Sequence, residues 1–140
     1  MTATLVDTNV LVYAYQKGRD DPRHRKAKEA LAELILGGGG CVSVQSLAEL
    51  SSVFLKKQKP PLPPADILGI VADLEAALSV LRPGADTVKG ALRAVDAHQL
   101  PFWDAMIWSV ARENGVGEIL SEDFQDGRTV EGVRFRNPLR

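Results

Sequence analysis

Residues 2–9, with the sequence TATLVDTN, decide the fold of this chain. Within them Thr4, Leu5 and Val6 form a short β-prone run without a polar face, which is typical of a central strand covered on both sides. The next run, residues 10–15, is apolar almost all round and predicts a helix buried against the same sheet. We therefore expect a strand over residues 2–7 that presents the Asp7 carboxylate at its carboxyl end, where open α/β sheets bind ligands.

The turn Asp7-Thr8-Asn9 also has a simpler explanation. All three residue types accept hydrogen bonds from the free backbone N–H groups at the start of a helix. Considered alone, the turn fits helix capping and ligand binding equally well. The positions of the other carboxylates along the chain must decide between them.

Composition indicates one soluble globular domain spanning residues 1–140, because 45% of the residues are hydrophobic and 25% are charged. No apolar run reaches membrane-spanning length and the N-terminus lacks the features of a signal peptide, so we expect a cytoplasmic protein that does not enter a membrane. A single cysteine, Cys41, excludes an internal disulfide and a multi-thiolate metal site. Its position in an expected strand predicts a small buried hydrophobe.

The net charge of −1 does not exclude a nucleic-acid partner, since a local basic face can exist within a neutral total. Solvated helix faces are the alternative explanation for each basic group. The basic groups are residues 19–28 (Arg19, Arg23, Arg25, Lys26 and Lys28), residues 56–59 (Lys56, Lys57 and Lys59), and the C-terminal Arg128, Arg134, Arg136 and Arg140.

Strand-like and helix-like segments alternate along the chain, which predicts a mostly parallel sheet with helices on both faces. Residues 59–64 are rich in proline and form a connector between two helices. Glycines 37–40 are expected to form a flexible turn. The expected strands are 2–7, 41–44, 79–81, 118–120 and an edge strand 133–135. Six helices are expected: one after residue 9, one that begins at Pro22, one after Ser46, and three that span 66–78, 86–98 and 102–114.

Hydrophobic periodicity predicts which faces of the last two helices are buried. In helix 86–98, Val88, Leu92 and Val95 are expected to point inward. In helix 102–114, Trp103 and Trp108 are interpreted as core anchors rather than base-stacking platforms.

Four carboxylates stand out by position. Asp7 and Asp123 follow expected strands, and Glu49 and Asp104 lie near the starts of helices. Capping alone does not explain why all four would meet at one end of the sheet. Clustered carboxylates persist only by taking up protons or binding a cation, and oxygen-only ligands select Mg²⁺ or Mn²⁺. Such a site orients a phosphodiester and activates a water molecule to attack it.

These motifs resemble the successive acidic motifs of PIN-domain nucleases, specifically the VapC-type toxins of bacterial toxin–antitoxin pairs. The resemblance covers nearly the whole chain. It implies a three-layer α/β/α fold with a mostly parallel sheet of roughly five strands, a Mg²⁺- or Mn²⁺-dependent endoribonuclease acting on RNA, a homodimer, and a VapB-type antitoxin as partner. The segments that carry it are TLVDTNVL (4–11), SLAEL (46–50), FWDA (102–105) and LSEDF (120–124).

Carried over by position, the resemblance makes Asp7, Glu49 and Asp104 the core acids that bind the metal and catalyse cleavage. Asp123 is the expected fourth acid, two residues after Ser121, with Glu122 and Asp126 as adjacent rivals. Asn9 and Ser121, with Asp126, are expected to support the site by orienting acids or water.

Two other functions remain open. One is an antitoxin-bound regulatory module that binds DNA or RNA and has little nuclease activity of its own. The other is a small Mg²⁺-dependent phosphohydrolase, which is disfavoured because Asn9 stands where a second aspartate would follow Asp7. Incubating the purified chain with RNA, with and without EDTA, separates the first alternative from a nuclease.

Overall fold

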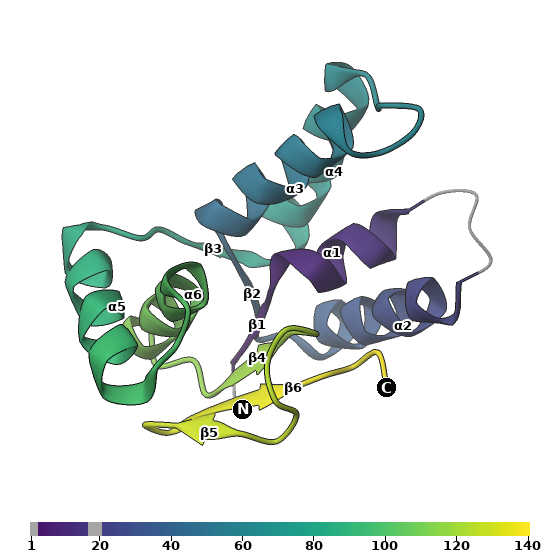
Figure 1. Ribbon diagram of the computed structural model, residues 1–140. Coiled ribbons are helices and arrows are strands. Elements are labelled where there is room, and N and C mark those ends of the chain that lie inside the picture. The colour runs from purple at the N-terminus through teal and green to yellow at the C-terminus, as the bar shows by residue number, and fades with distance from the viewer. Residues whose placement is uncertain (1–2, 17–20) are drawn as a thin grey trace.

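The computed structural model describes residues 3–16 and 21–140. It contains one sheet with the strand order β3-β2-β1-β4-β6-β5, so the first strand of the chain lies inside the sheet (Figure 1). The strands from β3 to β6 pair in parallel, and β5 is antiparallel to β6. The predicted mostly parallel sheet is confirmed. The strands are β1 (Thr4–Val6), β2 (Gly40–Ser43), β3 (Ser79–Leu81), β4 (Glu118–Leu120), β5 (Thr129–Val130) and β6 (Val133–Arg136).

Helices cover both faces of the sheet and complete the predicted three layers (Figure 1). Leu5 packs with residues of α5 and α6 on one face, whereas its neighbour Val6 packs with residues of α1 to α4 on the other. Among the described residues, none of the helices has the length and apolarity that crossing a membrane requires. The helices are α1 (Thr8–Tyr15), α2 (Pro22–Gly37), α3 (Val44–Lys56), α4 (Pro64–Ala77), α5 (Ala85–His98) and α6 (Phe102–Glu113).

The strand order changes direction at β1, and this places the turns that matter for function. From β1 the chain builds β2 and then β3 on one side, and later returns to add β4 on the other side of β1. The crevice at the carboxyl ends of β1 and β4 is therefore the topological switch point of the sheet, the usual ligand-binding position in such folds. Asp7 directly follows β1 and Ser121 directly follows β4.

Several element boundaries differ from the sequence-based prediction. The first strand covers Thr4–Val6 instead of residues 2–7, and residues 1–2 lie outside the described part. The second strand begins at Gly40 and ends at Ser43. Helix α3 consequently starts at Val44, before the expected Ser46, because the Ser43 hydroxyl caps it by accepting a 3.2 Å hydrogen bond from the Gln45 backbone N–H.

The glycine-rich turn predicted for residues 37–40 is only partly a turn. Gly37 ends α2, whereas Gly40 belongs to β2. A Cβ atom at Gly40 would lie 2.6 Å from the Cδ2 atom of Leu78, so a larger residue there would force the buried Leu78 side chain to shift.

Residues 133–135 form a strand as predicted, but it is not the edge of the sheet. The hairpin through Gly132 adds β5 outside β6. Cys41 is a buried residue of β2, as predicted.

The buried face of α5 differs from the predicted one. Val88 and Leu92, which were expected inside, are 38% and 56% exposed. Thr87, Ala91 and Ala94 are buried in their place. The reason is the close approach of α6: a Cβ atom at position 90 would lie 2.5 Å from the Ser109 hydroxyl oxygen, so only small residues fit between the two helices.

Trp103 was also predicted incorrectly as a core residue. It is 64% exposed, whereas Trp108 is 4% exposed and donates a 3.1 Å hydrogen bond from Nε1 to the Val130 carbonyl oxygen. The continuous buried segment of α6 is 105–111, so Trp103 lies just before the buried part of the helix.

Candidate active site

Asp7 is a buried carboxylate held in place by two hydrogen bonds. It is 5% exposed. Its Oδ1 accepts a 2.7 Å hydrogen bond from the Thr8 backbone N–H, and its Oδ2 accepts a 2.9 Å hydrogen bond from the Ser121 hydroxyl. Asp7 thus caps α1, as the simpler explanation predicted, but its second oxygen faces the turn after β4. Neither hydrogen-bond donor carries a positive charge to balance the carboxylate.

The environment of Asp7 favours the protonated acid. Burial raises its pKa from 3.8 to about 6, which outweighs the opposite effect of the hydrogen bonds from Ser121 and Thr8. The charges of Asp123 and Asp104 raise the pKa further. Two other predicted acids therefore lie within electrostatic reach of Asp7.

Asp104 is coupled electrostatically both to the acids that follow β1 and β4 and to Glu49 on α3. It lies in the first turn of α6 and is partly buried. Burial raises its pKa most, followed by the charges of Asp123 and Glu49. Glu49 lies on α3, where its Oε1 accepts a 2.9 Å hydrogen bond from the Gln45 side-chain amide. The structure thus brings Asp7, Glu49, Asp104 and Asp123 into one electrostatic group.

The turn after β4 distinguishes Asp123 from its two rivals. Glu122 is engaged elsewhere, since the Tyr13 hydroxyl donates to it at 3.5 Å and Arg23 lies 3.9 Å from it. The Asp126 carboxylate accepts a 3.0 Å hydrogen bond from the Asn137 backbone N–H and braces the loop. Asp123 is exposed and raises the pKa of both Asp7 and Asp104. Of the three, Asp123 is the carboxylate that acts on the other acids.

Asn9 and Ser121 join the turn after β1 to the turn after β4. The Asn9 side-chain amide donates to the Ser121 hydroxyl oxygen at 3.4 Å, and its carbonyl oxygen accepts a 3.2 Å bond from the Glu122 backbone N–H. The Ser121 oxygen also accepts a 3.2 Å bond from the Asp123 backbone N–H. Both polar residues therefore fix the spacing between Asp7 and Asp123.

The sequence analysis did not find three neighbours of the site. Gln45 holds Glu49, and its spacing of four residues on one helix would have indicated this pair. Tyr13 and Arg23 hold Glu122, and the Arg23 guanidinium lies 4.7 Å from the centre of the Tyr13 ring. No sequence pattern links residue 122 to residues 13 and 23, because the contact depends on how the last strands pack beside α1.

The four carboxylates are better suited to a hard cation that keeps some of its water ligands than to a cation that protein atoms enclose completely. Within residues 3–16 and 21–140, no three Asp, Glu, His or Cys side chains form a ready-made metal cage. The donor set is nevertheless composed of carboxylate oxygens around a buried acid whose hydrogen-bond donors are neutral. This chemistry fits Mg²⁺ or Mn²⁺, since Mg²⁺ keeps several waters and takes one or two carboxylates directly.

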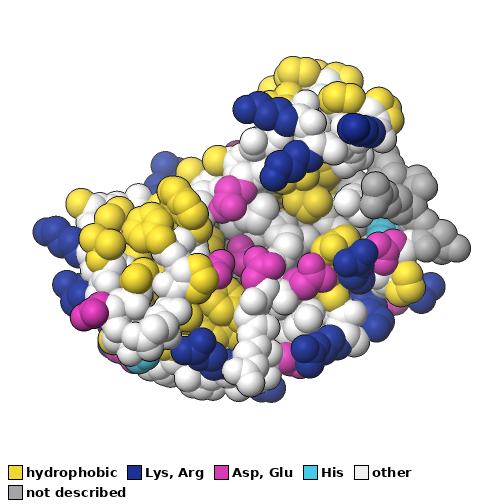
Figure 2. All heavy atoms as spheres, in the orientation of Figure 1, with side chains coloured by type: hydrophobic (Ala, Val, Ile, Leu, Met, Phe, Trp, Pro, Cys, Tyr) yellow, Lys and Arg dark blue, Asp and Glu magenta, His cyan; other side chains and the backbone are white. Residues whose placement is uncertain are grey.

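The surface around the acids has mixed charge. Figure 2 shows acidic side chains gathered in a hollow at the centre of this face, with basic side chains over the α3 and α4 region above and hydrophobic side chains over α5 and α6 at the left. Negative charge in the hollow and positive charge on its border fit a polyanion whose phosphate is bound through a metal ion.

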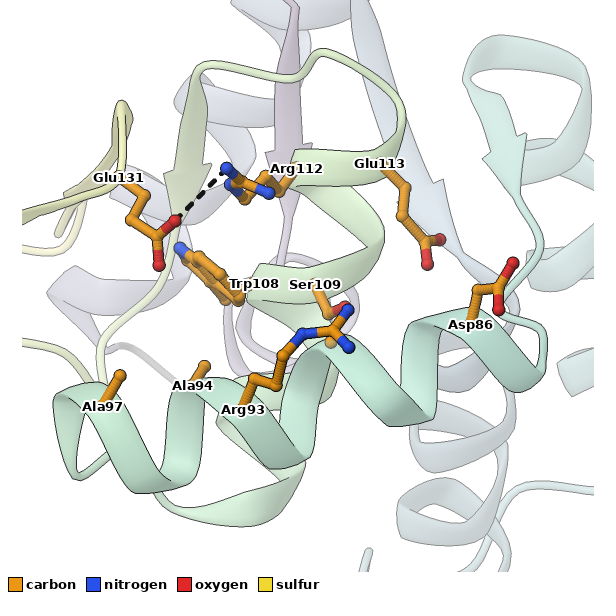
Figure 3. Close-up of a pocket in the computed structure, with 10 residues that line it drawn as sticks. Asp86, Arg93, Ala94, Ala97, Trp108, Ser109, Arg112, Glu113 and Glu131 are labelled. Atoms are coloured by element: carbon orange, nitrogen blue, oxygen red, sulfur yellow. Dashed lines mark ion pairs between the residues drawn. The ribbon is translucent and has the colours of Figure 1, made fainter.

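A separate groove of about 550 Å³ lies between α5 and α6, but it contains none of the four acids. Its charged groups include a paired network: Figure 3 shows Arg112 directed toward Glu131, which it meets at 3.2 Å. Glu131 also lies 2.7 Å from His98, and this hydrogen bond lowers the pKa of Glu131. The groove therefore has a structural charge network and is not the acid site.

Comparison with known families identifies the domain type. The family model of the PIN domain matches residues 4–125, which include all four acids. No curated protein matches the sequence significantly.

Solved structures with the same fold include a toxin and a toxin–antitoxin complex. The chain superposes on Mycobacterium tuberculosis VapC20, a toxin that cleaves the sarcin–ricin loop, with a TM-score of 0.68, 22% identity and coverage of 94% of this chain and 99% of that chain. It superposes on the DNA-bound VapBC of Salmonella typhimurium with a TM-score of 0.69, 20% identity and 99% coverage of each chain. For FitAcB of Neisseria gonorrhoeae the TM-score is 0.60, with 17% identity and coverage of 96% and 97%.

Proposed function

Because this chain belongs to the PIN-domain family, we propose that it is a Mg²⁺- or Mn²⁺-dependent endoribonuclease and the toxin of a toxin–antitoxin pair, as in VapC-type proteins. The observation that carries the proposal is the buried Asp7 at the switch point of the sheet, coupled to Asp104 and Asp123. Such a group costs stability unless a cation is bound. We propose that residues 1–140 act as one nuclease domain.

In this proposal Asp7, Glu49, Asp104 and Asp123 hold the metal. A bound Mg²⁺ or Mn²⁺ would supply positive charge for the scissile phosphate and lower the pKa of a bound water. The Ser121 hydroxyl keeps the Asp7 carboxylate in a fixed orientation through its 2.9 Å hydrogen bond. Asn9 holds Ser121 in turn, so both residues position acids instead of contacting the phosphate themselves.

The direct test is RNA cleavage by the purified chain in Mn²⁺ and in EDTA. We expect cleavage only with the metal, and we expect Asp7→Asn, Glu49→Gln and Asp104→Asn each to reduce the rate by at least ~100-fold, as loss of a key electrostatic group does. Glu75→Gln, an exposed acid on α4, is the matched control and should cleave normally. Near-normal cleavage by any of the three variants would remove that residue from the site, and RNA binding without cleavage would favour the regulatory module.

The identity of the fourth acid is tested in the same assay. Asp123→Asn should reduce cleavage less than the three core substitutions, because the adjacent Glu122 or Asp126 can partly substitute for it. Glu122→Gln and Asp126→Asn should have smaller effects still, since both carboxylates already accept hydrogen bonds. A larger loss in either of these two would reassign the fourth acid.

We further propose a VapB-type antitoxin as partner. An apolar groove of about 230 Å³ between α3 and α4 supports a helical partner, because its residues Leu55 and Leu68 are 42% and 70% exposed. The partner would inhibit by inserting a basic side chain, arginine by preference, toward the four acids, where it replaces the charge of the metal. Leu55→Glu with Leu68→Glu should then weaken inhibition by the partner and leave cleavage by the free chain intact.

We also propose a cytoplasmic homodimer, as the VapC resemblance implies. Light scattering of the purified chain measures the mass of the free protein, and a monomer at micromolar concentration would remove the dimer from the proposal.

A further inference from the structure

We infer that Trp103 forms a nucleobase-binding platform beside the acid group and stacks on an unpaired base of the RNA substrate. The inference rests on the proposed ribonuclease function and adds the residue that holds the substrate. It starts from the side chain that the sequence analysis placed incorrectly in the core. With 64% exposure, Trp103 leaves most of an indole ring in water.

The exposed ring is held at the start of α6. The ring centres of Phe102 and Trp103 lie 5.1 Å apart, and their planes meet at 72°. A near-perpendicular contact of this kind orients the indole but cannot cover both of its faces. Trp103 therefore presents an oriented aromatic surface, which is what base stacking requires.

Backbone contacts connect this surface to the acid group. Trp103 directly precedes Asp104 in the chain. The Gln45 side-chain amide lies 3.5 Å from the Trp103 carbonyl oxygen and donates a 2.9 Å hydrogen bond to Glu49. The same amide thus contacts both the backbone of the exposed aromatic and one of the acids, so one side chain connects the residue that carries the ring to the acid group.

The connection of Trp103 to the acid group favours RNA over a protein partner. A protein-docking surface is usually an extended patch with few charged residues at its centre. The Trp103 backbone instead contacts Gln45, and Trp103 directly precedes Asp104, whose pKa is raised by Glu49. Proteins bind unpaired RNA bases by aromatic stacking combined with hydrogen bonds to base edges. An exposed indole on a residue that contacts an amide side chain and directly precedes Asp104 offers such a combination.

The test measures cleavage and binding of a short single-stranded RNA by three variants. Trp103→Ala should raise KM by ~5- to 160-fold, the range expected for one lost base stack, with kcat nearly unchanged. Trp103→Phe keeps an aromatic face and should stay within a few-fold of wild type. Leu36→Ala is the matched control, because Leu36 is 89% exposed at the far end of α2, which leads into the opposite end of the parallel strands.

Fluorescence provides a direct signature of stacking. The chain has two tryptophans, and Trp108 is buried. In an Asp7→Asn background, which prevents cleavage, RNA should quench the emission of the chain with Trp103 intact and have little effect after Trp103→Phe. An oligonucleotide with an abasic nucleotide at the stacked position should lose the same affinity that Trp103→Ala loses.

Three results would overturn the platform. One is equal KM for Trp103→Ala and Leu36→Ala, and another is a Trp103→Ala effect that persists with every abasic oligonucleotide. The third is a Trp103→Ala protein with a changed oligomeric mass and unchanged RNA affinity, which would make the ring part of a protein interface. These failures differ from failure of the nuclease proposal, in which the wild-type chain itself does not cleave RNA in Mn²⁺.

Discussion

The Ser121 hydroxyl donates a 2.9 Å hydrogen bond to the Asp7 carboxylate across 114 residues of sequence. This contact joins the ends of two adjacent parallel strands, β1 and β4, at the point where the sheet reverses its strand order. The buried acid has the Ser121 hydroxyl and a backbone N–H as its hydrogen-bond donors, so its charge stays uncompensated. The predictions for Asp7 and Asp104 follow from this imbalance.

Asp7 should make the metal-free protein less stable as pH rises. Its folded-state pKa of about 6 lies above the ordinary 3.8, so the folded state binds the proton more tightly. The stabilisation is complete below about pH 4 and is lost between pH 4 and 6, an effect on the order of 3 kcal/mol. In EDTA, the free energy of unfolding of Asp7→Asn minus that of wild type should increase by this amount between pH 4 and pH 7, as measured by denaturant unfolding. A constant difference across that range would mean that Asp7 is not protonated in the fold.

Asp104 tests whether the acids form one metal site. Replacing it with Asn removes one negative charge at nearly constant volume, so in EDTA the variant should be as stable as wild type or more stable. Millimolar Mn²⁺ should raise the Tm of wild type by mass action on the folded state and raise that of Asp104→Asn much less. Thermal melts of both proteins in both buffers decide this. A destabilised variant that still gains fully from Mn²⁺ would make Asp104 a structural residue.

The close packing of α5 against α6 predicts an unfavourable glycine-to-alanine change. A Cβ atom at position 90 would lie 2.5 Å from the Ser109 hydroxyl oxygen, which is buried and bonded to the Thr87 carbonyl at 2.9 Å. Gly90→Ala should therefore cost about 1–3 kcal/mol, as overpacking does, despite the better helix propensity of alanine.

Two variants control the Gly90 measurement. Gly69→Ala lies in α4 with no atom within 4 Å of the added carbon, so it should stabilise by about 1 kcal/mol. Adding Ser109→Ala removes the clashing oxygen and should recover part of the stability in a double-mutant cycle. If Gly90→Ala is as favourable as Gly69→Ala, the two helices separate more easily than the structure indicates.

The basic residues of α2 predict the salt dependence of RNA binding. Arg19 lies outside the described residues, whereas Arg25 is exposed. Arg23 pairs with Asp21 at 3.0 Å, and Lys26 donates to the Leu139 carbonyl at 3.4 Å. Reversal of Arg23, Arg25 and Lys26 to Glu should weaken binding and lower the log–log salt slope by ~0.7 for each phosphate that is no longer neutralised. Lys89→Glu on α5 is the control. An unchanged salt slope in the triple variant would mean that these basic residues form a solvated helix face and do not contact RNA.

Sequence alone predicted the layers and the positions of Asp7 and Asp123 after two strands, because both follow from the order of elements. Apolar runs without a polar face identified the parallel strands, and carboxyl ends of parallel strands meet at one edge. This reasoning placed Asp7 and Asp123 correctly relative to β1 and β4. It did not require knowledge of any side-chain contact.

The errors have a different physical origin. On α5, the most hydrophobic stripe contains Val88 and Leu92, yet the buried stripe contains Ala91 and Ala94. Periodicity ranks residues by hydrophobicity, whereas a close helix pair selects small residues. For Trp103, the pattern did not reveal where along α6 the buried segment begins. In both cases the distance between elements, which is a tertiary property, decided exposure.

The position of β1 inside the sheet also has a consequence for synthesis of the chain on the ribosome. Asp7 and its strand are synthesised more than 100 residues before residues 118–120, which form one neighbour of that strand. A nascent or truncated chain that stops before residue 118 leaves β1 without β4 and Asp7 without its hydroxyl donor. Three of the four acids are present in such a chain, yet their shared site is not assembled. A chain with this topology therefore assembles the shared acid site only after residue 123 has been synthesised.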